Sequence, residues 1–363
     1  MTVYVIIESW NDHDVIIYML EGENRMKTLS VIVPSYNSES YMMQCIDSLI
    51  NIDKGIEIII VNDGSVDQTK LIANQYATKY PDQIKAIHQE NKGHGGAVNT
   101  GIAHASGQYI KVVDSDDWVN RQSLMKIVKK LKALIEADEA VDMMISNFVY
   151  DKVGVKQKKV MHYKGVLPQD RVFTWKNIGK FKPGNYILMH SVIYNIEILK
   201  ACKLELPNHT FYVDNLFVYL PLPYVKTMYY MDECLYHYYI GRDDQSVNER
   251  VMMKRINQQL FVNELMIEKV DLKSIKERKK STYMAHYLNI VTTVSSILLI
   301  KIGDKEAISK KENLWREIKK YDLVLYFKLR TSLLGSIIHF PGQIGKKITL
   351  FAYEKAQQRF GFN

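Results

Sequence analysis

Three carboxylates, Asp114, Asp116 and Asp117, follow a run of apolar residues in the stretch VVDSDDWV. Crowded carboxylates repel one another, and an ionised group at the edge of a core is costly unless a cation neutralises it. Hard divalent cations take carboxylate oxygens together with the phosphates of a substrate. Asp114 and Asp116, separated by one small residue, could therefore hold one metal ion. The alternative is a capped turn that leads into a helix beginning near Arg121.

Similar polar clusters end three other apolar runs: PSYN from Pro34, NDGS from Asn62 and QEN from Gln89. In the second cluster Asp63 precedes Gly64, where glycine permits an unusual backbone angle. The carboxylate could accept hydrogen bonds from N–H or hydroxyl groups of a ligand. An ordinary turn would have the same residues.

The segment NKGHGGAVNTG, residues 91–101, places four glycines at the entry to an expected helix. Glycine-rich helix starts bind phosphate in many nucleotide-binding proteins. This chain, however, has neither GxGxxG after its first clear strand nor GxxxxGK[ST]. The sequence therefore disfavours a dinucleotide dehydrogenase and a P-loop kinase.

The elements that must position these residues alternate regularly from Leu29 to Tyr150. Short apolar runs rich in β-branched residues alternate with amphipathic stretches, which predicts an α/β fold with a mainly parallel sheet and helices on both faces. We expect the strands at 29–34, 56–63, 84–89, 109–114 and 141–150. Ligands of such sheets bind beyond the carboxyl ends of the strands, so the polar clusters should lie side by side at one edge.

The pattern changes outside this region. Residues 151–248 mix short strands and helices, and we expect them to cover that edge. From Glu249 the pattern is mostly helical. The first 25 residues lack the basic start of a signal peptide and do not look like catalytic fold. The expected organisation is an N-terminal extension (1–25), a catalytic domain (26–248) and a C-terminal helical region (249–363).

Composition narrows the class of protein. With 47% apolar and 24% charged residues the chain has an ordinary globular composition. Three cysteines without metal-binding spacing argue against a disulfide scaffold or a structural zinc site. No apolar run approaches the ~20 residues needed to span a bilayer, so we expect no integral membrane protein.

The net charge of +8 lies in the C-terminal third, where residues 250–363 hold 22 Lys and Arg against 10 Asp and Glu. Such a region suits nucleic acid, an anionic membrane or no particular partner. Residues 321–363 mix aromatic, aliphatic and basic residues, as do helices that lie on anionic membranes. A helix packed on the catalytic domain would look similar.

Three stretches together resemble the nucleotide-sugar-binding half of the family 2 glycosyltransferases, which have the GT-A fold: LSVIVPSYNSESYMMQCIDSL, IEIIIVNDGSVDQT and NKGHGGAVNTGIAHASGQYIKVVDSDDWV. The motifs occur in order across residues 29–120, and further signals extend to about 248. The resemblance implies that residues 26–120 bind a nucleotide sugar and that residues 121–248 form the acceptor side.

The resemblance also implies roles for single residues. Pro34 and Tyr36 would border the nucleotide base, Asp63 would bind the base, usually uracil, and Asn91 and Gly93 would line the nucleotide pocket.

In the family's DxD pair, Asp116 would bind Mn²⁺ or Mg²⁺ and Asp114 would contact the ribose or the metal. Asp117 is expected to cap the next turn. An inverting transfer also needs a base for the acceptor hydroxyl. The matching position in FYVDNLF is Asp214, for which an N-cap aspartate is the alternative.

In GRDDQSV, the resemblance implies that Arg242 neutralises phosphate charge and that Gln245 and Ser246 donate hydrogen bonds, unless the segment is a solvated loop. His190 matches a position where family members often have a polar residue beside the acceptor, but the sequence favours a satisfied core histidine.

Three positions depart from the family pattern. Val98 stands where an arginine is common, and His94 or a residue from elsewhere could replace that charge. Val213 stands where an acid is common, and Asn62 replaces the first aspartate of DDGS.

The expected function is the metal-assisted, inverting transfer of a hexose or N-acetylhexosamine from a UDP-sugar to a polysaccharide, teichoic acid or lipid-linked glycan. A nucleotidyltransferase and a catalytically silent binding or scaffold protein are the alternatives. We expect a cytoplasmic enzyme, with peripheral membrane contact through the basic tail, a homo-oligomer as an open option and no nucleic-acid partner.

Overall fold

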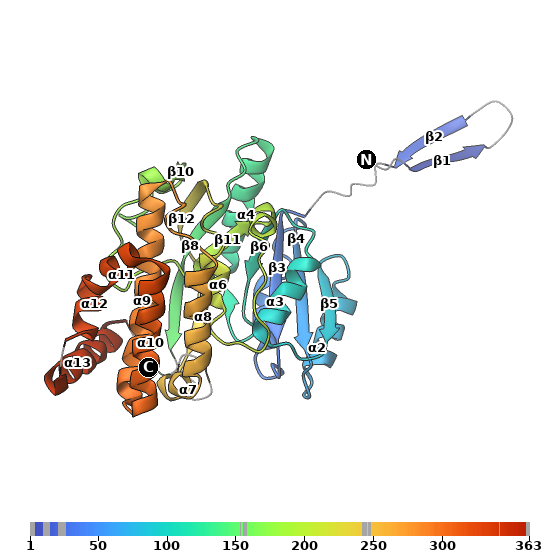
Figure 1. Cartoon of the computed structure of the whole chain (residues 1–363). Coiled ribbons are helices and arrows are strands. Elements are labelled where there is room, and N and C mark those ends of the chain that lie inside the picture. Colours follow the sequence, from blue (N-terminus) through green and yellow to red (C-terminus); the bar gives the residue numbers. More distant parts are fainter. Residues whose placement is uncertain are drawn as a thin grey trace.

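The computed structural model describes residues 4–9, 15–20, 27–152, 154, 158–241, 245, 248–340 and 342–360. Within these residues a ten-stranded sheet forms the centre of the molecule, and a separate two-stranded antiparallel sheet is formed by β1 (Tyr4–Ser9) and β2 (Val15–Leu20) (Figure 1). That hairpin lies in the segment expected to be an N-terminal extension.

The strands of the large sheet follow the order β10-β12-β8-β11-β6-β3-β4-β5, with β7 pairing with β12 and β9 with β8. Their bounds are β3 (Leu29–Ser35), β4 (Ile56–Asp63), β5 (Ile84–Gln89), β6 (Tyr109–Val112), β7 (Trp118–Val119), β8 (Met143–Lys152), β9 (Lys159–Met161), β10 (Val172–Thr174), β11 (Val192–Asn195) and β12 (Thr227–Ile240).

Strand direction confirms the predicted mainly parallel arrangement in the first half of the chain. Strands β3, β4, β5 and β6 are parallel neighbours, so their carboxyl ends meet at one edge. The short strand β11 runs antiparallel between β6 and β8, whereas β8 and β12 are parallel.

Helices cover both faces of the sheet, as the alternating pattern predicts (Figure 1). The first six are α1 (Met42–Leu49), α2 (Thr69–Lys79), α3 (Gly93–Ala103), α4 (Arg121–Glu136), α5 (Ile196–Ala201) and α6 (Asp214–Tyr219); short 3₁₀ turns occupy η1 (Trp175–Asn177) and η2 (Met189–Ser191). Alternate residues of β3 supply the two cores: Val31 and Val33 pack with α1 and α4, and Ile32 packs with α3 on the opposite face.

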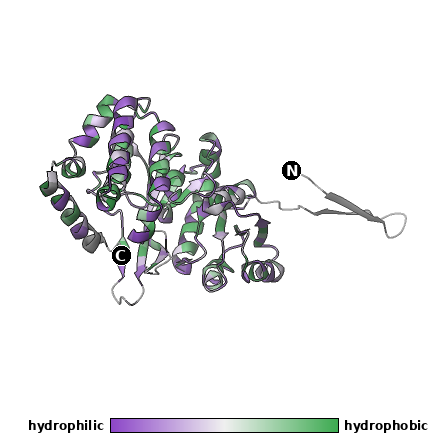
Figure 2. Ribbon diagram, turned by 60° about the horizontal axis from the view of Figure 1, so that its bottom comes forward, coloured by the Kyte–Doolittle hydropathy of each residue, from purple (hydrophilic) through white to green (hydrophobic). Residues whose placement is uncertain are grey.

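The C-terminal region contains α7 (Glu249–Lys254), α8 (Ile256–Glu268), α9 (Arg278–Ile302), α10 (Lys305–Tyr321), α11 (Leu323–Arg330), α12 (Leu333–Ile338) and α13 (Gly342–Phe360). Hydrophobic and hydrophilic residues alternate around these helices (Figure 2). Their buried residues join the same hydrophobic cluster as α3 and α6, so the helical region shares a core with the sheet.

Among the described residues, α9 is the one helix long and apolar enough to cross a bilayer. It passes this test by length and mean hydropathy, although threonine, serine and asparagine interrupt its apolar residues. The apolar window of α9 is 89% buried within the molecule. It is therefore the central helix of the C-terminal bundle, which makes its apolar character weak evidence for a membrane span.

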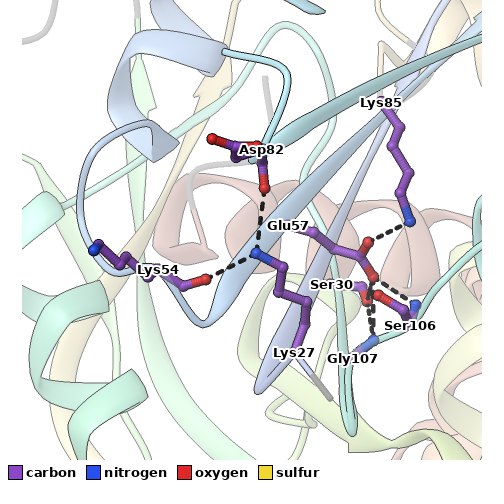
Figure 3. A network of polar contacts seen from close by, with 8 residues as sticks. All are labelled: Lys27, Ser30, Lys54, Glu57, Asp82, Lys85, Ser106 and Gly107. Atoms are coloured by element: carbon purple, nitrogen blue, oxygen red, sulfur yellow. Dashed lines mark hydrogen bonds and ion pairs between the residues drawn. The ribbon is translucent and has the colours of Figure 1, made fainter. Parts of the chain in front are cut away.

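A buried carboxylate clamps the amino ends of the central strands (Figure 3). Glu57 of β4 accepts hydrogen bonds from Ser30 Oγ at 2.5 Å, from the backbone N–H of Ser106 at 2.5 Å and from Lys85 Nζ at 2.8 Å. Burial alone would raise the pKa of Glu57, but these donors lower it below the ordinary value. Glu57 thus ties β3, β4 and the turn before β6 together at the edge opposite the polar clusters.

Candidate active site

The polar clusters that follow β3, β4 and β6 lie at one edge of the sheet, as predicted from their position at strand ends. The loop after β3 is joined to the DSD segment by a hydrogen bond between Ser38 Oγ and Ser115 Oγ at 2.8 Å. Ser115, the small residue between Asp114 and Asp116, is buried by this contact. Successive side chains of the DSD segment thus point to opposite sides: Ser115 is buried, whereas Asp114 and Asp116 are partly exposed.

Asp63 at the end of β4 is held in a fixed orientation. It is buried, and its Oδ1 accepts hydrogen bonds from Gln89 Nε2 at 2.6 Å and from the backbone N–H of Lys92 at 2.8 Å. Asn91 Nδ2 donates to the carbonyl of Asp63 at 2.9 Å. Gly64 has φ +70, and a Cβ there would lie 2.7 Å from the Asn91 nitrogen, so glycine is required at this turn.

Pro34 and Tyr36 differ in exposure although they are two residues apart. Pro34 is buried at the end of β3, while the Tyr36 side chain is 52% exposed just beyond it. An exposed ring next to a rigid strand end offers a flat apolar surface to a ligand.

His94 in the first turn of α3 contacts the end of β6. Its Nε2 lies 2.7 Å from Asp114 Oδ1. Burial would lower the pKa of His94, but Asp114, with Asp214 and Asp116, raises it above the ordinary value. Burial would raise the pKa of Asp114, and His94 lowers it instead. His94 and Asp114 thus form an imidazole–carboxylate contact in which each side chain favours the charged form of the other.

Asp214 is the first residue of α6, and its N-cap is Val213, which makes no side-chain cap. The alternative of an N-cap aspartate is therefore wrong. Burial raises the pKa of Asp214 to about 6, against the opposing charge of His94 and with a further contribution from Asp114. A carboxyl group with this pKa is mostly ionised at neutral pH and can accept a proton.

The glycines of α3 make room for another segment of the chain. A Cβ on Gly93 would lie 2.9 Å from the His209 backbone, and a Cβ on Gly95 would lie 2.6 Å from the Pro207 carbonyl oxygen. Asn99 holds the same segment with two hydrogen bonds to the Leu206 backbone, at 2.8 and 3.0 Å. The glycine pattern therefore brings the segment that leads to Asp214 against α3.

Residues 30–198 match the family model described as "Glycosyl transferase family 2". The chain is 27% identical to EpsH of Bacillus subtilis, named as a glycosyltransferase, over 75% of this chain and 76% of EpsH. It is 25% identical to the poly(ribitol-phosphate) beta-N-acetylglucosaminyltransferase TarS of Staphylococcus aureus, over 73% of this chain but 44% of TarS. The chain therefore contains a family 2 glycosyltransferase domain over residues 30–198.

Solved structures of low sequence identity have the same GT-A fold. Residues 1–349 of Staphylococcus aureus TarS, in complex with UDP-GlcNAc, superpose with a TM-score of 0.63 at 22% identity, and 92% of each chain is covered. A mannosyltransferase from Pyrobaculum calidifontis, in complex with GDP-Man and Mn²⁺, has a TM-score of 0.50 at 15% identity, with 90% of this chain and 87% of that chain covered.

The Asp117 side chain of this glycosyltransferase makes different hydrogen bonds from those expected. Its Oδ2 accepts a hydrogen bond from Tyr236 Oη at 2.5 Å, and its Oδ1 accepts one from the Tyr239 N–H at 2.7 Å. The next helix, α4, is instead capped by Asn120, whose side chain accepts from the Ser123 N–H. The prediction that Asp117 caps the turn was wrong, because its partners lie on β12, far away in the sequence.

Lys111, a residue that the sequence analysis did not select, lies buried in β6 beneath the site. Its Nζ donates to the carbonyls of Met189, His190 and Val192 at 3.0, 2.6 and 3.2 Å. Burial lowers the pKa of Lys111 to about 7, although Asp114 and Asp117 favour its charged form. One indication of this role was present in the sequence: a lysine in the middle of an apolar strand must find hydrogen-bond partners inside the protein, because both faces of such a strand are buried.

His190 is buried, as expected for a core histidine. Its ring stacks on Tyr238 with centroids 4.2 Å apart, and burial lowers its pKa to about 3, so the ring is neutral. Among the described residues, its Nδ1 has no hydrogen-bond partner.

Among the described residues, one group of side chains has the spacing of metal ligands, and it includes Asp114 but not Asp116, the other expected ligand. Ligand atoms of Asp114, Asp117 and His190 lie within 4.8 Å of one another. Burial, together with the charges of Asp116 and Asp114, raises the pKa of Asp117 well above its usual range. A cation among these carboxylates would relieve their mutual repulsion.

The positions that depart from the family pattern are buried. Val98 packs between α3 and the sheet, and Val213 packs before α6. Asn62 donates from Nδ2 to His88 Nδ1 at 3.3 Å, and its Oδ1 accepts from the Ser65 N–H. These side chains therefore serve packing and turn geometry here.

The segment expected to close over the diphosphate is described only in part. Arg242 and Ser246 lie outside the described residues. Gln245 is buried, donating to the Tyr239 carbonyl at 2.5 Å and accepting from the Gly241 N–H at 2.9 Å. The Gln245 side chain is thus hydrogen-bonded to the backbone at the end of β12.

Proposed function

We propose that this glycosyltransferase moves a hexose or N-acetylhexosamine from a UDP-sugar to a hydroxyl group of a polysaccharide, teichoic acid or lipid-linked glycan, with inversion at the anomeric carbon. The observation that carries the proposal is the convergence of His94 with Asp114, Asp116 and Asp214 at the carboxyl edge of the sheet. A histidine whose protonated form is favoured by three neighbouring carboxylates suits a site that must hold a diphosphate, a cation and a reacting hydroxyl.

The nucleotide end of the donor is assigned to the ends of β3 and β4. Tyr36 and Pro34 would border the base, and Asp63 would accept from its N–H group through Oδ2, because both of its protein donors bind Oδ1. Asn91 and Gly93 would line the same pocket from the start of α3. The TarS structure with UDP-GlcNAc supports a uridine nucleotide as the first donor to test.

Asp214 is proposed as the general base. It would take the proton from the acceptor hydroxyl as that oxygen attacks the anomeric carbon and the bond to the diphosphate oxygen breaks. The electron pair of that bond leaves with UDP. The pKa of about 6 suits this role, because the carboxylate is available at neutral pH and is still basic enough to accept a proton.

Asp116 and Asp114 are proposed to hold Mn²⁺ or Mg²⁺, which would supply positive charge to the departing diphosphate. His94 would orient Asp114 through their 2.7 Å contact. Arg242 is proposed to add a further positive charge near the phosphates.

The acceptor and the cellular site remain part of the proposal. The similarity to TarS, whose name describes transfer to poly(ribitol-phosphate), supports an envelope polymer as acceptor. Synthesis from nucleotide sugars supports a cytoplasmic enzyme, either free or peripheral on the inner face of the membrane, and a homo-oligomer is compatible with this role.

Neither alternative function is favoured by a structural observation. The case for a silent binding protein rested on Val98 and Val213, and both are buried packing residues. A nucleotidyltransferase would need a basic residue beside the first strand for a triphosphate, and VPSYNSE contains none.

Calorimetry with a panel of nucleotide sugars in Mn²⁺ tests the donor assignment. We expect binding of at least one UDP-sugar, and a loss of affinity of about tenfold or more in Asp63→Asn, because a base N–H loses its charged acceptor. Absence of binding by every UDP-sugar in the wild-type protein would reject the proposal.

A further inference from the structure

Large apolar side chains are unusually exposed on the last three helices. Figure 1 shows α11, α12 and α13, drawn in red, at the end of the molecule away from β5. We use the name α11–α13 face for the exposed apolar residues of these helices and of the turn before α13: Leu323 (51%), Val324 (73%), Phe327 (53%), Leu333 (66%), Phe340 (54%), Ile344 (69%), Ile348 (43%) and Phe351 (61%). The preceding helix, α10, exposes only Tyr321 in this class among its described residues.

The exposed residues of α13 form a stripe. Ile344, Ile348 and Phe351 are spaced i, i+4 and i+7, which places them on one side of a helix. The opposite side packs inward, since Thr349 is buried and donates from Oγ1 to the Ile337 carbonyl of α12 at 2.9 Å. The helix is therefore fixed with an apolar stripe outward.

The same arrangement occurs on α11. Leu323 and Phe327 are exposed at i and i+4, while Leu325 and Leu329 pack inward. Asp322 anchors the helix by accepting from the N–H groups of Val324 and Leu325, at 2.8 and 3.0 Å.

Basic residues accompany both stripes. Lys328 and Arg330 follow on α11, and Lys347 and Lys355 lie on α13; all four are exposed. Of the two acids between residues 321 and 355, Asp322 is buried and only Glu354 is exposed. The face is therefore apolar and positively charged.

We propose that the α11–α13 face docks on an anionic lipid surface, with its apolar stripes among the headgroups and its Lys and Arg side chains on the lipid phosphates. The positive charge of the face favours an anionic lipid surface over a second copy of the chain as the binding partner. Two copies of the face would bring their basic residues together, whereas an anionic bilayer complements them. The docking is peripheral, because the helix long enough to span a bilayer, α9, is buried behind this face.

Vesicle flotation of the full chain, without any sugar nucleotide, tests this proposal separately from the catalytic one. We expect the protein to float with vesicles that contain about a third phosphatidylglycerol and not with pure phosphatidylcholine, because headgroup charge contributes to docking. The triple variant Ile344→Ser, Ile348→Ser, Phe351→Ser should lower the bound fraction at least about tenfold, since three side chains leave the interface.

A second variant isolates the charge contribution. Lys328→Gln, Arg330→Gln, Lys347→Gln should weaken binding about tenfold or more and reduce its dependence on salt. The matched control is Met43→Ser, Leu71→Ser, Met125→Ser, which removes apolar side chains of similar exposure (50%, 52% and 53%) from α1, α2 and α4. This control should bind within about twofold of the wild type, because surface residues outside an interface have little effect.

Three results would overturn the proposal. The first is that the wild-type protein does not float with anionic vesicles. The second is that the α13 triple variant floats with them to the same extent as the wild type. The third is a dimer, detected by sedimentation velocity without lipid, that the triple variant converts to a monomer while flotation is unchanged; that result would assign the face to a second copy.

Discussion

His94 Nε2 lies 2.7 Å from Asp114 Oδ1, so an imidazole–carboxylate contact joins the start of α3 to the segment that follows β6. Asp116 and Asp214 also act on the charge of this histidine. Val98, one turn further along α3, is buried and cannot supply the positive charge that an arginine brings in other family members. We infer that His94 is the cationic residue of this region of the site.

His94→Gln should lower the rate of sugar transfer about tenfold to a hundredfold, because three carboxylates lose a positive neighbour. It should also move the acidic limb of the pH–rate profile upward, since His94 lowers the pKa of Asp214. The matched control is His104→Gln at the other end of α3, where the ring is exposed and its Nδ1 lies 2.9 Å from the Thr100 carbonyl oxygen. A His94→Gln enzyme with a wild-type rate and limb would contradict this role.

The wild-type rate should fall below about pH 6, by about tenfold per pH unit, because burial raises the pKa of Asp214 to about 6 and only the ionised form accepts a proton. Steady-state UDP release between weakly acidic and weakly basic pH measures this limb. A rate that stays constant well below this pH would exclude Asp214 as the base.

Asp214→Asn should abolish transfer by about a thousandfold and stabilise the ligand-free protein at neutral pH by about 1–2 kcal/mol. The folded-state pKa of about 6 lies above the value of about 4 for an unfolded aspartate, so the ionised carboxylate destabilises the fold above pH 6. The stability difference should disappear as the pH falls below about 4, where the group is protonated in both states.

Urea unfolding at several pH values measures that difference, with the exposed Glu139→Gln as the control for removal of a negative charge. A less stable Asp214→Asn protein at neutral pH would mean that the carboxylate makes favourable contacts in the fold.

Lys111→Met should destabilise the protein by about 2–4 kcal/mol, because three carbonyls of the 189–192 turn lose their buried donor. We expect kcat to fall more than KM changes, since the turn carries His190 beside Asp114 and Asp117. Lys129→Met, on the exposed side of α4, is the control. An unchanged free energy of unfolding and an unchanged kcat would show that Lys111 does not position the 189–192 turn.

Gly95→Ala should cost about 1–3 kcal/mol and lower kcat, because a Cβ 2.6 Å from the Pro207 carbonyl displaces the segment leading to Asp214. Gly165→Ala is the comparison, since Gly165 has φ +79 but nothing within 4 Å of a Cβ. It should cost about 1 kcal/mol through the backbone alone and leave the rate unchanged. Equal rates for the two variants would contradict the proposed contact.

The parallel half of the fold could be predicted because its signals are local. The strands β3, β4, β5 and β6 are short runs buried on one or both faces, and the polar residues after them mark the ligand edge. The strand β11 could not be predicted in the same way, since its four residues gain their antiparallel position only by pairing with β6 and β8.

In the candidate site, too, residues with local signals could be predicted and long-range contacts could not. Asp63, Asp114 and Asp214 could be selected from neighbouring residues and from the resemblance to a family. The contact of Asp117 with Tyr236 spans 119 residues, and Gly93 and Gly95 of α3 face residues 206–209, so no local pattern reveals either partner. The charge of Lys111 was visible in YIKVV, but its three acceptors lie on a distant turn.

The release of UDP from a UDP-sugar in the presence of Mn²⁺ and a glycan acceptor tests the central claim most directly. We predict metal-dependent release by the wild-type protein and a loss of about a hundredfold or more in both Asp116→Asn and Asp214→Asn, with UDP-sugar binding retained in the latter. Release that is independent of metal and unchanged in both variants would contradict the account.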